Sequence, residues 1–94
     1  MALIAVTYTY NDLPELRAAH LSAHREFLGS LPGLVLSGPT STGSALLLFE
    51  GDVDTESIET TLDDDPFRAV GLIDARQVFE WTPVLGSWKD TLGL

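Results

Sequence analysis

The sequence predicts a single α+β domain over residues 1–94, with a ferredoxin-like βαββαβ order of elements around an antiparallel sheet. Three observations lead to this fold class. A chain of 94 residues has room for one hydrophobic core. Its 45% hydrophobic and 20% charged residues are typical of a globular domain. Alternating and helical hydrophobic patterns follow one another, separated by turn residues and without an internal repeat.

The first strand and the first helix are marked by composition and by capping signals. Residues 2–10 are rich in Val, Ile, Thr and Tyr, which favour strands. Asp12 and Glu15 have the spacing of a capping box, and Pro14 is tolerated in a first turn because its missing N–H has no partner there. These signals predict a helix over residues 13–30. At about 100° per residue, its inward stripe consists of Leu13, Leu16, His20, Ala23, His24, Phe27 and Leu31.

The next two strands are expected at residues 34–37 and 44–50, on either side of a short polar loop. In the second of them Ala45, Leu47 and Phe49 alternate with two leucines, so that both faces of the strand are apolar. A sheet covered by helices on one face normally shows polar residues on the other. We therefore expect a homodimer in which two sheets pack face to face as a dimeric α/β barrel.

The second half of the chain supplies one more helix and one more strand. Asp54 or Thr55 is expected to cap a short acidic helix, which ends at the acidic run of residues 63–65. Residues 72–83 alternate again and predict the last strand. Residues 86–94 are then a tail.

Charge and composition exclude several classes of function. Five Lys and Arg residues against fourteen Asp and Glu residues give a formal charge of −9, so we expect neither a nucleic acid nor a membrane as a partner. The absence of Cys excludes disulfides, thiolate metal sites and Cys nucleophiles. No apolar stretch approaches the ~20 residues of a membrane span, and no basic residue opens the chain as in a signal peptide. We expect a cytoplasmic protein.

The two histidines are the candidates for proton transfer, because imidazole is the side chain that ordinarily titrates near neutral pH. His20 lies near the centre of the predicted inward stripe, where an imidazole needs a hydrogen-bond partner. His20 is either a core residue whose ring N–H donates to a backbone carbonyl, or a residue with a functional role. His24 follows at the i, i+4 spacing of two-histidine metal sites, but no carboxylate stands between the two residues as in H-E-x-x-H.

Asp65 is expected to differ from the two aspartates before it in the direction of its side chain. Asp63, Asp64 and Asp65 lack the spacing of a calcium loop and are expected to form a solvated turn. Within it, the Asp-Pro-Phe sequence can point Asp65 inward, and a carboxylate beside an imidazole orients the ring and stabilises its protonated form. Ser44 is a turn residue or an additional hydroxyl, and Tyr8 is a packing residue or part of a pocket.

The order of short motifs along the chain resembles that of the YciI-like (YCII-related) family. The motifs are Arg17-x-x-His20-Leu21, Leu36-x-Gly38-Pro39, Gly43-Ser44, Asp65-Pro66-Phe67, Gly71-Leu72 and the aromatic-proline ending from Trp81 to Pro83. The resemblance implies a dimeric α+β barrel and a His–Asp dyad, carried here onto His20 and Asp65 with Ser44 as a third polar member. His24 has no counterpart in the family motif.

The candidate site therefore consists of His20, Asp65 and Ser44 as catalytic residues. The residues expected to bind substrate are Arg17, Tyr8 and Pro39.

The resemblance also implies a class of reaction, since some relatives act on chlorinated or hydroxylated ring compounds without a cofactor. Our first hypothesis is a lyase or isomerase with no metal and no cofactor, in which His20 moves the proton and Asp65 orients it. The alternative is a non-catalytic binding or accessory protein, in which the same pair orients a small ligand. A cofactor-free monooxygenase is a third interpretation, based on fold analogy alone.

Overall fold

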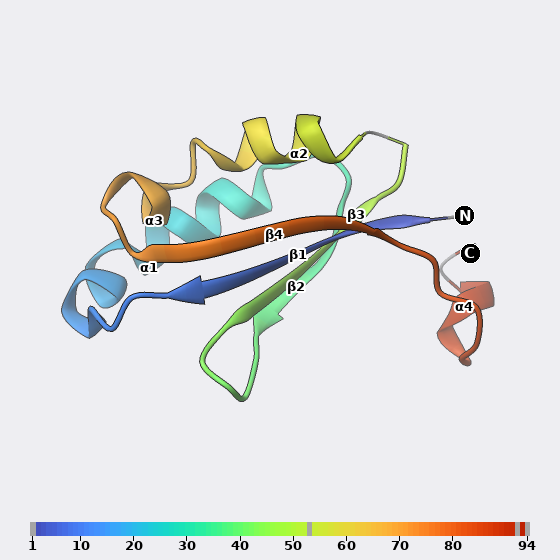
Figure 1. Ribbon diagram of the computed structural model, residues 1–94, viewed down its shortest axis with the longest axis horizontal. Coiled ribbons are helices and arrows are strands. Elements are labelled where there is room, and N and C mark those ends of the chain that lie inside the picture. Colours follow the sequence, from blue (N-terminus) through green and yellow to red (C-terminus); the bar gives the residue numbers. More distant parts are fainter. Residues whose placement is uncertain (1, 53, 92, 94) are drawn as a thin grey trace.

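Four antiparallel strands form one sheet, and the larger helices lie on one of its faces in the computed structural model (Figure 1). The structure describes residues 2–52, 54–91 and 93. The elements in chain order are β1 (Leu3–Tyr10), α1 (Pro14–Gly29), β2 (Leu34–Pro39), β3 (Ala45–Glu50), α2 (Thr55–Leu62), α3 (Pro66–Ala69), β4 (Ile73–Trp81) and α4 (Trp88–Thr91). The helix α4 lies away from the others, at the end of the molecule where both termini are found (Figure 1).

The strand order β2-β3-β1-β4 places β3 between β1 and β2, and β1 between β3 and β4. Both strand–helix–strand units are therefore split by a strand from the other unit, and all neighbouring strands are antiparallel. The α+β, ferredoxin-like fold predicted from the sequence is confirmed. The sequence did not indicate α3, which is a single turn between α2 and β4.

The core lies between the sheet and the helices. Successive side chains of a strand point to opposite faces, so Ile4, Val6 and Tyr8 of β1 face the helices together. They lie beside the inward residues of β3, because Val6 is opposite Leu47 in the register. The core is completed from the helical side by Leu28, Ile58 and Leu62, and from β3 by Ala45 and Phe49.

The predicted capping box of the first helix is wrong. The N-cap of α1 is Leu13, and no side chain caps the helix. The first helical hydrogen bond runs from the Arg17 N–H to the Leu13 carbonyl, so Asp12 lies one residue too early to reach the free amides. Pro14 takes the first helical position, as expected. In contrast, Asp54 caps α2 as predicted, since its carboxylate accepts the Ser57 N–H at 2.7 Å, and this bond lowers the pKa of Asp54.

The inward face of α1 is rotated from the predicted stripe. His24 and Leu28 are its buried residues, whereas Leu13 is 43% exposed and Ala23 is also exposed. Arg17 and His24 line the same side of the helix, facing the sheet. The side of α1 that faces the sheet therefore carries His24 together with both arginines of the helix, Arg17 and Arg25.

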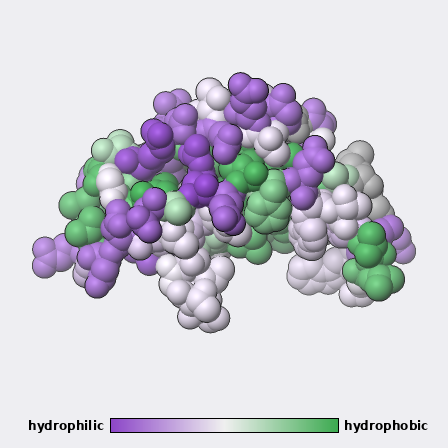
Figure 2. All heavy atoms as spheres, viewed as in Figure 1, coloured by the Kyte–Doolittle hydropathy of each residue, from purple (hydrophilic) through white to green (hydrophobic). Residues whose placement is uncertain are grey.

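The opposite face of the sheet is apolar and open. Leu46 of β3 is 41% exposed, and Phe79 and Trp81 of β4 are 42% and 46% exposed, on the side that points away from the helices. This confirms the prediction that both faces of β3 are apolar. In contrast, hydrophilic residues gather over the helical side at the top of Figure 2, and a hydrophobic group stands out at the end that carries α4.

Candidate functional site

A histidine and an aspartate form a buried hydrogen-bonded pair between α1 and the start of α3. His24 Nδ1 lies 2.8 Å from Asp65 Oδ1 and 2.9 Å from Asp65 Oδ2. The Asp65 side chain is fully buried and the His24 side chain is 9% exposed. A buried carboxylate needs charged or hydrogen-bonding partners, and this contact supplies one of them.

The local sequence explains how Asp65 is aimed. Asp65 is the N-cap of α3, Pro66 is suited to the first helical position, and the Phe67 N–H donates to Asp65 Oδ1 at 2.9 Å. Asp63 and Asp64 remain exposed. This confirms the prediction that Asp-Pro-Phe points one carboxylate of the acidic run inward.

Phe67 also positions the histidine. Its ring is stacked on the His24 imidazole, with centroids 3.8 Å apart and ring planes 2° from parallel. The buried ring of Phe67 therefore fixes the plane of the imidazole while its backbone amide fixes the carboxylate. Tyr10 packs edge-on against the same ring, at 6.0 Å between centroids.

The pair borders a cavity of about 240 Å³ between α1 and the sheet. Its walls come from three parts of the chain. These are α1 with the end of β1, the β2–β3 hairpin, and α3. The lining residues are Tyr10, Arg17, Leu21, His24, Arg25, Leu28, Ser37, Gly38, Pro39, Ala45, Leu47 and Phe67. The cavity thus combines aromatic and aliphatic walls with the imidazole and two guanidinium groups.

The geometry assigns different tasks to the two ring nitrogens of His24. An ionised carboxylate can only accept, so Nδ1 carries the proton that is shared with Asp65. In the neutral ring Nε2 then has a free lone pair. Nε2 has no hydrogen-bond partner in the described part of the chain and is not sealed from solvent. It is therefore the atom available to a molecule in the cavity, with Asp65 behind it to stabilise an imidazolium.

The predicted pairing of Asp65 with His20 is wrong, because the partner of this carboxylate is His24. His20 is half-buried and does not line the cavity within the described residues. The two histidines lie only about 40° apart around the helix axis, so the hydrophobic stripe did not separate them. The contact of α1 with α3 decides between them.

The other predicted site residues divide into two groups. Arg17 and Pro39 line the cavity with His24. Tyr8 is fully buried in the core, and the described lining does not include it. Ser44 closes the β2–β3 hairpin through its backbone, where its carbonyl accepts the Thr40 N–H at 3.1 Å, and it does not line the cavity either.

The sequence does not predict most of the cavity lining, and three of the unpredicted residues carry the chemistry of the site: His24, Phe67 and Arg25. His24 was treated as a packing residue or a metal ligand, and Phe67 and Arg25 were given no role. A signal for Phe67 was present, because it follows Asp65-Pro66 directly. For Arg25 the sequence offered no signal, since an arginine on a helix is usually part of a solvated face.

A second buried polar group lies next to the pair. The Tyr8 hydroxyl has no partner with hydrogen-bond geometry among the described residues, although the Arg76 guanidinium is near enough to oppose the rise of its pKa. Burial, and then the charge of Asp65, raises the pKa of Tyr8 well above its ordinary value. Burial also raises the pKa of Tyr10, against the opposing charge of Arg17. Both phenols are therefore protonated at neutral pH.

Two searches of the described part of the chain, for clusters of metal ligands and for membrane-spanning helices, found none. No three His, Asp or Glu side chains there come together as a metal site. Nor does any helix in residues 2–52, 54–91 and 93 have the length and apolar character to cross a bilayer.

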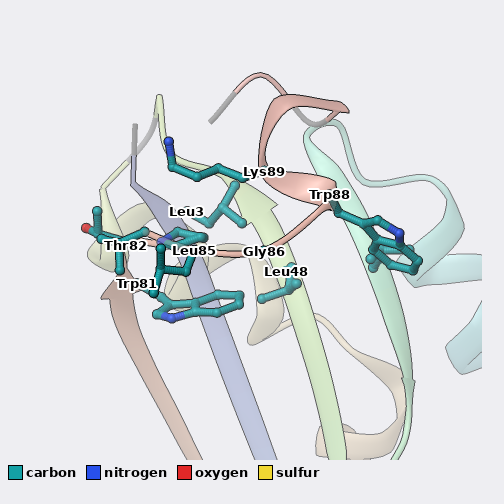
Figure 3. A pocket seen from close by; sticks show the side chains of 11 residues that line it. Leu3, Leu48, Trp81, Thr82, Leu85, Gly86, Trp88 and Lys89 are labelled. Atoms are coloured by element: carbon teal, nitrogen blue, oxygen red, sulfur yellow. The ribbon is translucent and has the colours of Figure 1, made fainter.

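A larger hollow of about 490 Å³ lies on the other face of the sheet, away from the histidine. Its walls are formed by strand residues such as Leu3 and Leu48 and by the segment that leads into α4. Figure 3 shows Trp81 and Trp88 on either side of Leu48. Lys89 is the one titratable residue among its described walls, so this hollow offers little acid–base chemistry.

Comparisons with known proteins agree with the fold. No family model matches the chain, and no curated protein matches it in sequence. The solved 5-chloro-2-hydroxyhydroquinone dehydrochlorinase of Burkholderia phenoliruptrix, in complex with 2,5-dihydroxybenzoquinone, is similar in structure, with a TM-score of 0.72. It is 22% identical, and the match covers 85% of this chain and 93% of that chain.

Two further solved structures are similar. A NIPSNAP domain protein of Burkholderia xenovorans has a TM-score of 0.54 and 13% identity, and the match covers 89% of this chain and 95% of that chain. A dabb family protein of Mesorhizobium loti, with a ferredoxin-like fold, has a TM-score of 0.51 and 12% identity, with 89% of this chain and 99% of that chain covered. At these identities the likeness establishes the fold, and the chain is an α+β protein of ferredoxin-like architecture.

Proposed function

We propose that this protein is a small cofactor-independent lyase or isomerase that moves a proton on a small ring compound. His24 is its general acid–base, and Asp65 orients the imidazole and stabilises its protonated form. The observation that carries the proposal is the buried contact of 2.8 Å at Nδ1, which leaves Nε2 open to a cavity. His24 thus takes the role that the sequence assigned to His20.

The proposed step needs only a base that can return its proton. Nε2 of His24 removes a proton from an acidic C–H or O–H group of the ring compound. In an elimination, the electron pair left behind forms a new double bond, and a group such as chloride leaves with its bonding pair. In an isomerisation, Nε2 returns the proton to a different atom. Neither route requires an oxidant or a reductant.

The magnitude of acid–base catalysis limits the kind of substrate. A positioned general acid–base typically contributes ~10²–10⁴ in rate. This suits an activated ring compound and would be too little for the hydrolysis of a stable bond. The structural likeness to a dehydrochlorinase solved with a dihydroxybenzoquinone supports the choice of ring compounds of this kind as first substrates.

The test compares two histidine variants that differ by one helical turn. Purified protein is incubated with 5-chloro-2-hydroxyhydroquinone and with related halogenated hydroxyquinols, and chloride release is followed with time. His24→Gln is expected to lose about 100-fold or more of the rate. The matched control His20→Gln is expected to keep it, because Asp65 pairs with His24 and His20 is not among the described residues that line the cavity. Circular dichroism of both variants checks that they are folded.

The outcomes separate the proposal from its alternative. A His24→Gln variant as fast as the wild type would show that the imidazole does not act in the reaction. Compounds that bind at the cavity with no chloride release and no proton exchange into solvent would favour the non-catalytic binding or accessory protein. Both functions would use the contact between His24 and Asp65, so the measurement of turnover decides between them.

We also propose that two copies of the chain form a homodimer through the apolar face of the sheet. A second copy fits this face because an isologous contact brings the same apolar residues together without complementary charges. The exposed Leu46, Phe79 and Trp81 would then be covered together with the hollow beside α4. Light scattering at low micromolar concentration is expected to give twice the chain mass of 10.2 kDa. A particle of one chain mass would reject the dimer.

We further propose that the chain is a YciI-like protein of the cytoplasm. The support is the order of its motifs, of which Asp65-Pro66-Phe67 and Gly38-Pro39 both contribute to the site. An alignment of relatives in which these two motifs and the histidine of Arg17-x-x-His20 recur at the same spacing would strengthen the assignment, and one that lacks them would weaken it.

A further inference from the structure

The arginines of this acidic chain differ in whether they contact a carboxylate. It has five Lys and Arg residues against fourteen Asp and Glu residues. Arg68 and Arg76 both contact Asp63, with N···O distances of 3.4 Å and 2.8 Å. Arg17 and Arg25 have no carboxylate partner within residues 2–52, 54–91 and 93, and both line the cavity that contains His24. Two guanidinium groups without a carboxylate partner among the described residues therefore border the cavity that contains the imidazole.

The two arginines lie on one side of α1, eight residues apart, which is about 12 Å along the helix axis. His24 lies between them in the sequence, directly before Arg25. Arg17 is held in place, because its guanidinium carbon lies 4.7 Å from the centre of the Tyr10 ring. Stacking occupies the face of the guanidinium and leaves its N–H edge available as a donor. Arg25 is exposed at the rim.

We propose that Arg17 and Arg25 bind an anionic ligand with a single ring, and that they select for its negative charge. The inference rests on the proposed function, because it names the class of substrate for the same site. The ligand class is an aromatic or quinonoid ring that carries a carboxylate or an ionised hydroxyl. Arg17 receives the anionic group in the cavity, and Arg25 receives it at the entrance.

The local charge favours an anion although the whole chain repels one. A net charge of −9 lowers the concentration of anions around the protein. This long-range effect is screened over about 10 Å at 0.1 M salt, whereas the contact with a guanidinium inside a cleft is not. No Asp or Glu appears among the described residues that line the cavity. Asp65 lies behind the imidazole, and its charge is shared with Nδ1.

The size and the walls of the cavity favour one ring. A cavity of about 150 Å³ lined by aliphatic and aromatic side chains holds benzene. The cavity here measures about 240 Å³, which leaves room for one ring and a few substituents. Its apolar walls include Tyr10, Phe67 and Leu28. They suit the ring, and the two guanidinium groups suit its charged substituent.

The test uses two probes of similar size and different charge, the anion benzoate and the neutral benzamide. Each is titrated into uniformly ¹⁵N-labelled protein, and the dissociation constant is taken from the shifts of amides around the cavity. Benzoate is expected to bind about tenfold more tightly than benzamide, because charge-assisted hydrogen bonds are the stronger ones. Arg17→Gln and Arg25→Gln are each expected to weaken benzoate binding about tenfold and to leave benzamide binding nearly unchanged.

Two further variants serve as controls. Arg68→Gln removes the same charge from an arginine outside the cavity and is expected to leave benzoate binding nearly unchanged. Arg17→Lys keeps the charge but loses the planar fork, so it is expected to bind benzoate with an affinity between the wild type and Arg17→Gln. The amide spectrum of each variant reports whether the fold is kept.

Several results would overturn the inference. They are equal binding of benzoate and benzamide, equal effects of Arg17→Gln and Arg68→Gln, and no binding of either probe. Failure of the proposed function is a separate result. His24→Gln keeps the preference for benzoate if the arginines act as proposed, whether or not His24 is needed for turnover. Anion selection with turnover that does not depend on His24 would thus refute the catalytic proposal alone.

Discussion

Replacing Asp65 by Asn is expected to disturb both the fold and the imidazole, because this carboxylate serves two donors. It accepts from His24 Nδ1 at 2.8 Å and from the Phe67 N–H at 2.9 Å, and it is fully buried. Hydrogen bonds to a charged group typically contribute about 1.5–3 kcal/mol each. Asn retains most of the helix-capping bond, since it ranks with Asp as an N-cap.

The loss in the Asp65→Asn variant therefore falls on the contact with His24. We expect a decrease of about 1.5–3 kcal/mol in the free energy of unfolding, measured by urea denaturation. Asp65→Ala is expected to cost about 1 kcal/mol more, because the cap is lost as well. The control Asp64→Asn, on an exposed neighbour, is expected to change stability by no more than about 0.5 kcal/mol.

The same variant tests the state of the ring. In the wild type, the ¹⁵N shifts of His24 are expected to show a proton on Nδ1 and a lone pair on Nε2 when the ring is neutral. An asparagine amide can donate as well as accept, so the fixed preference for this tautomer is lost. Chloride release should fall by about 10²–10⁴ if the ring is then misplaced. Unchanged stability together with an unchanged tautomer in Asp65→Asn would refute the reasoning.

Three further predictions follow from buried or exposed aromatic residues. Phe67→Ala is expected to lower the free energy of unfolding by about 3–5 kcal/mol, because it leaves a void beside the imidazole. Urea titration measures the change. Phe79→Ala serves as the control, because Phe79 is exposed and its loss is expected to cost much less. Because the pKa of Tyr8 is raised in the folded state, the phenol loses its proton at a higher pH when the protein is folded than when it is unfolded. The protonated phenol therefore contributes fully to stability below the ordinary pKa of 10.0, and this contribution is lost as the pH rises above that value. Tyr8→Phe removes the unpartnered hydroxyl, so denaturation at pH 7 should show no loss of stability and the alkaline decline should flatten; a large loss at pH 7 would mean that the hydroxyl has a partner. Trp81→Glu is expected to give a particle of one chain mass in light scattering while the fold is kept, and an unchanged dimer would place the interface elsewhere.

The fold was predictable because local signals and hydrophobic patterns agree along most of the chain. Alternation over β1 and β3, the Asp54 cap and the short apolar spacing of α2 each indicate the element that is found. The one-turn helix α3 was not predictable, since four residues are too few for a periodic pattern. The Asp-Pro-Phe sequence nevertheless gave the direction of Asp65 correctly, because proline and capping act over two or three residues.

The histidine of the pair was not predictable from the pattern of one helix. A functional cavity is a place where the core is not filled, so residues that line it do not need to be apolar. Arg17 and Arg25 count as polar and moved the apparent apolar stripe of α1 away from its true inward side. His20 and His24 both lie in the predicted stripe, and the motif resemblance, which has a counterpart for His20 alone, favours the wrong histidine. Only the packing of α1 against α3 fixes which imidazole reaches Asp65.

The His24–Asp65 pair and the wall of the cavity that faces it belong to different stretches of this backbone. The spacing of acid and base depends on α1 and on the residues from Asp65 to Phe67, while the facing wall, Ser37 to Pro39, belongs to the β2–β3 hairpin. Substitutions in that hairpin are therefore expected to change the space beside the imidazole and to leave the His24–Asp65 contact intact. If His24 is the general base that we propose, the hairpin can adapt the cavity to a different ring without disturbing that base.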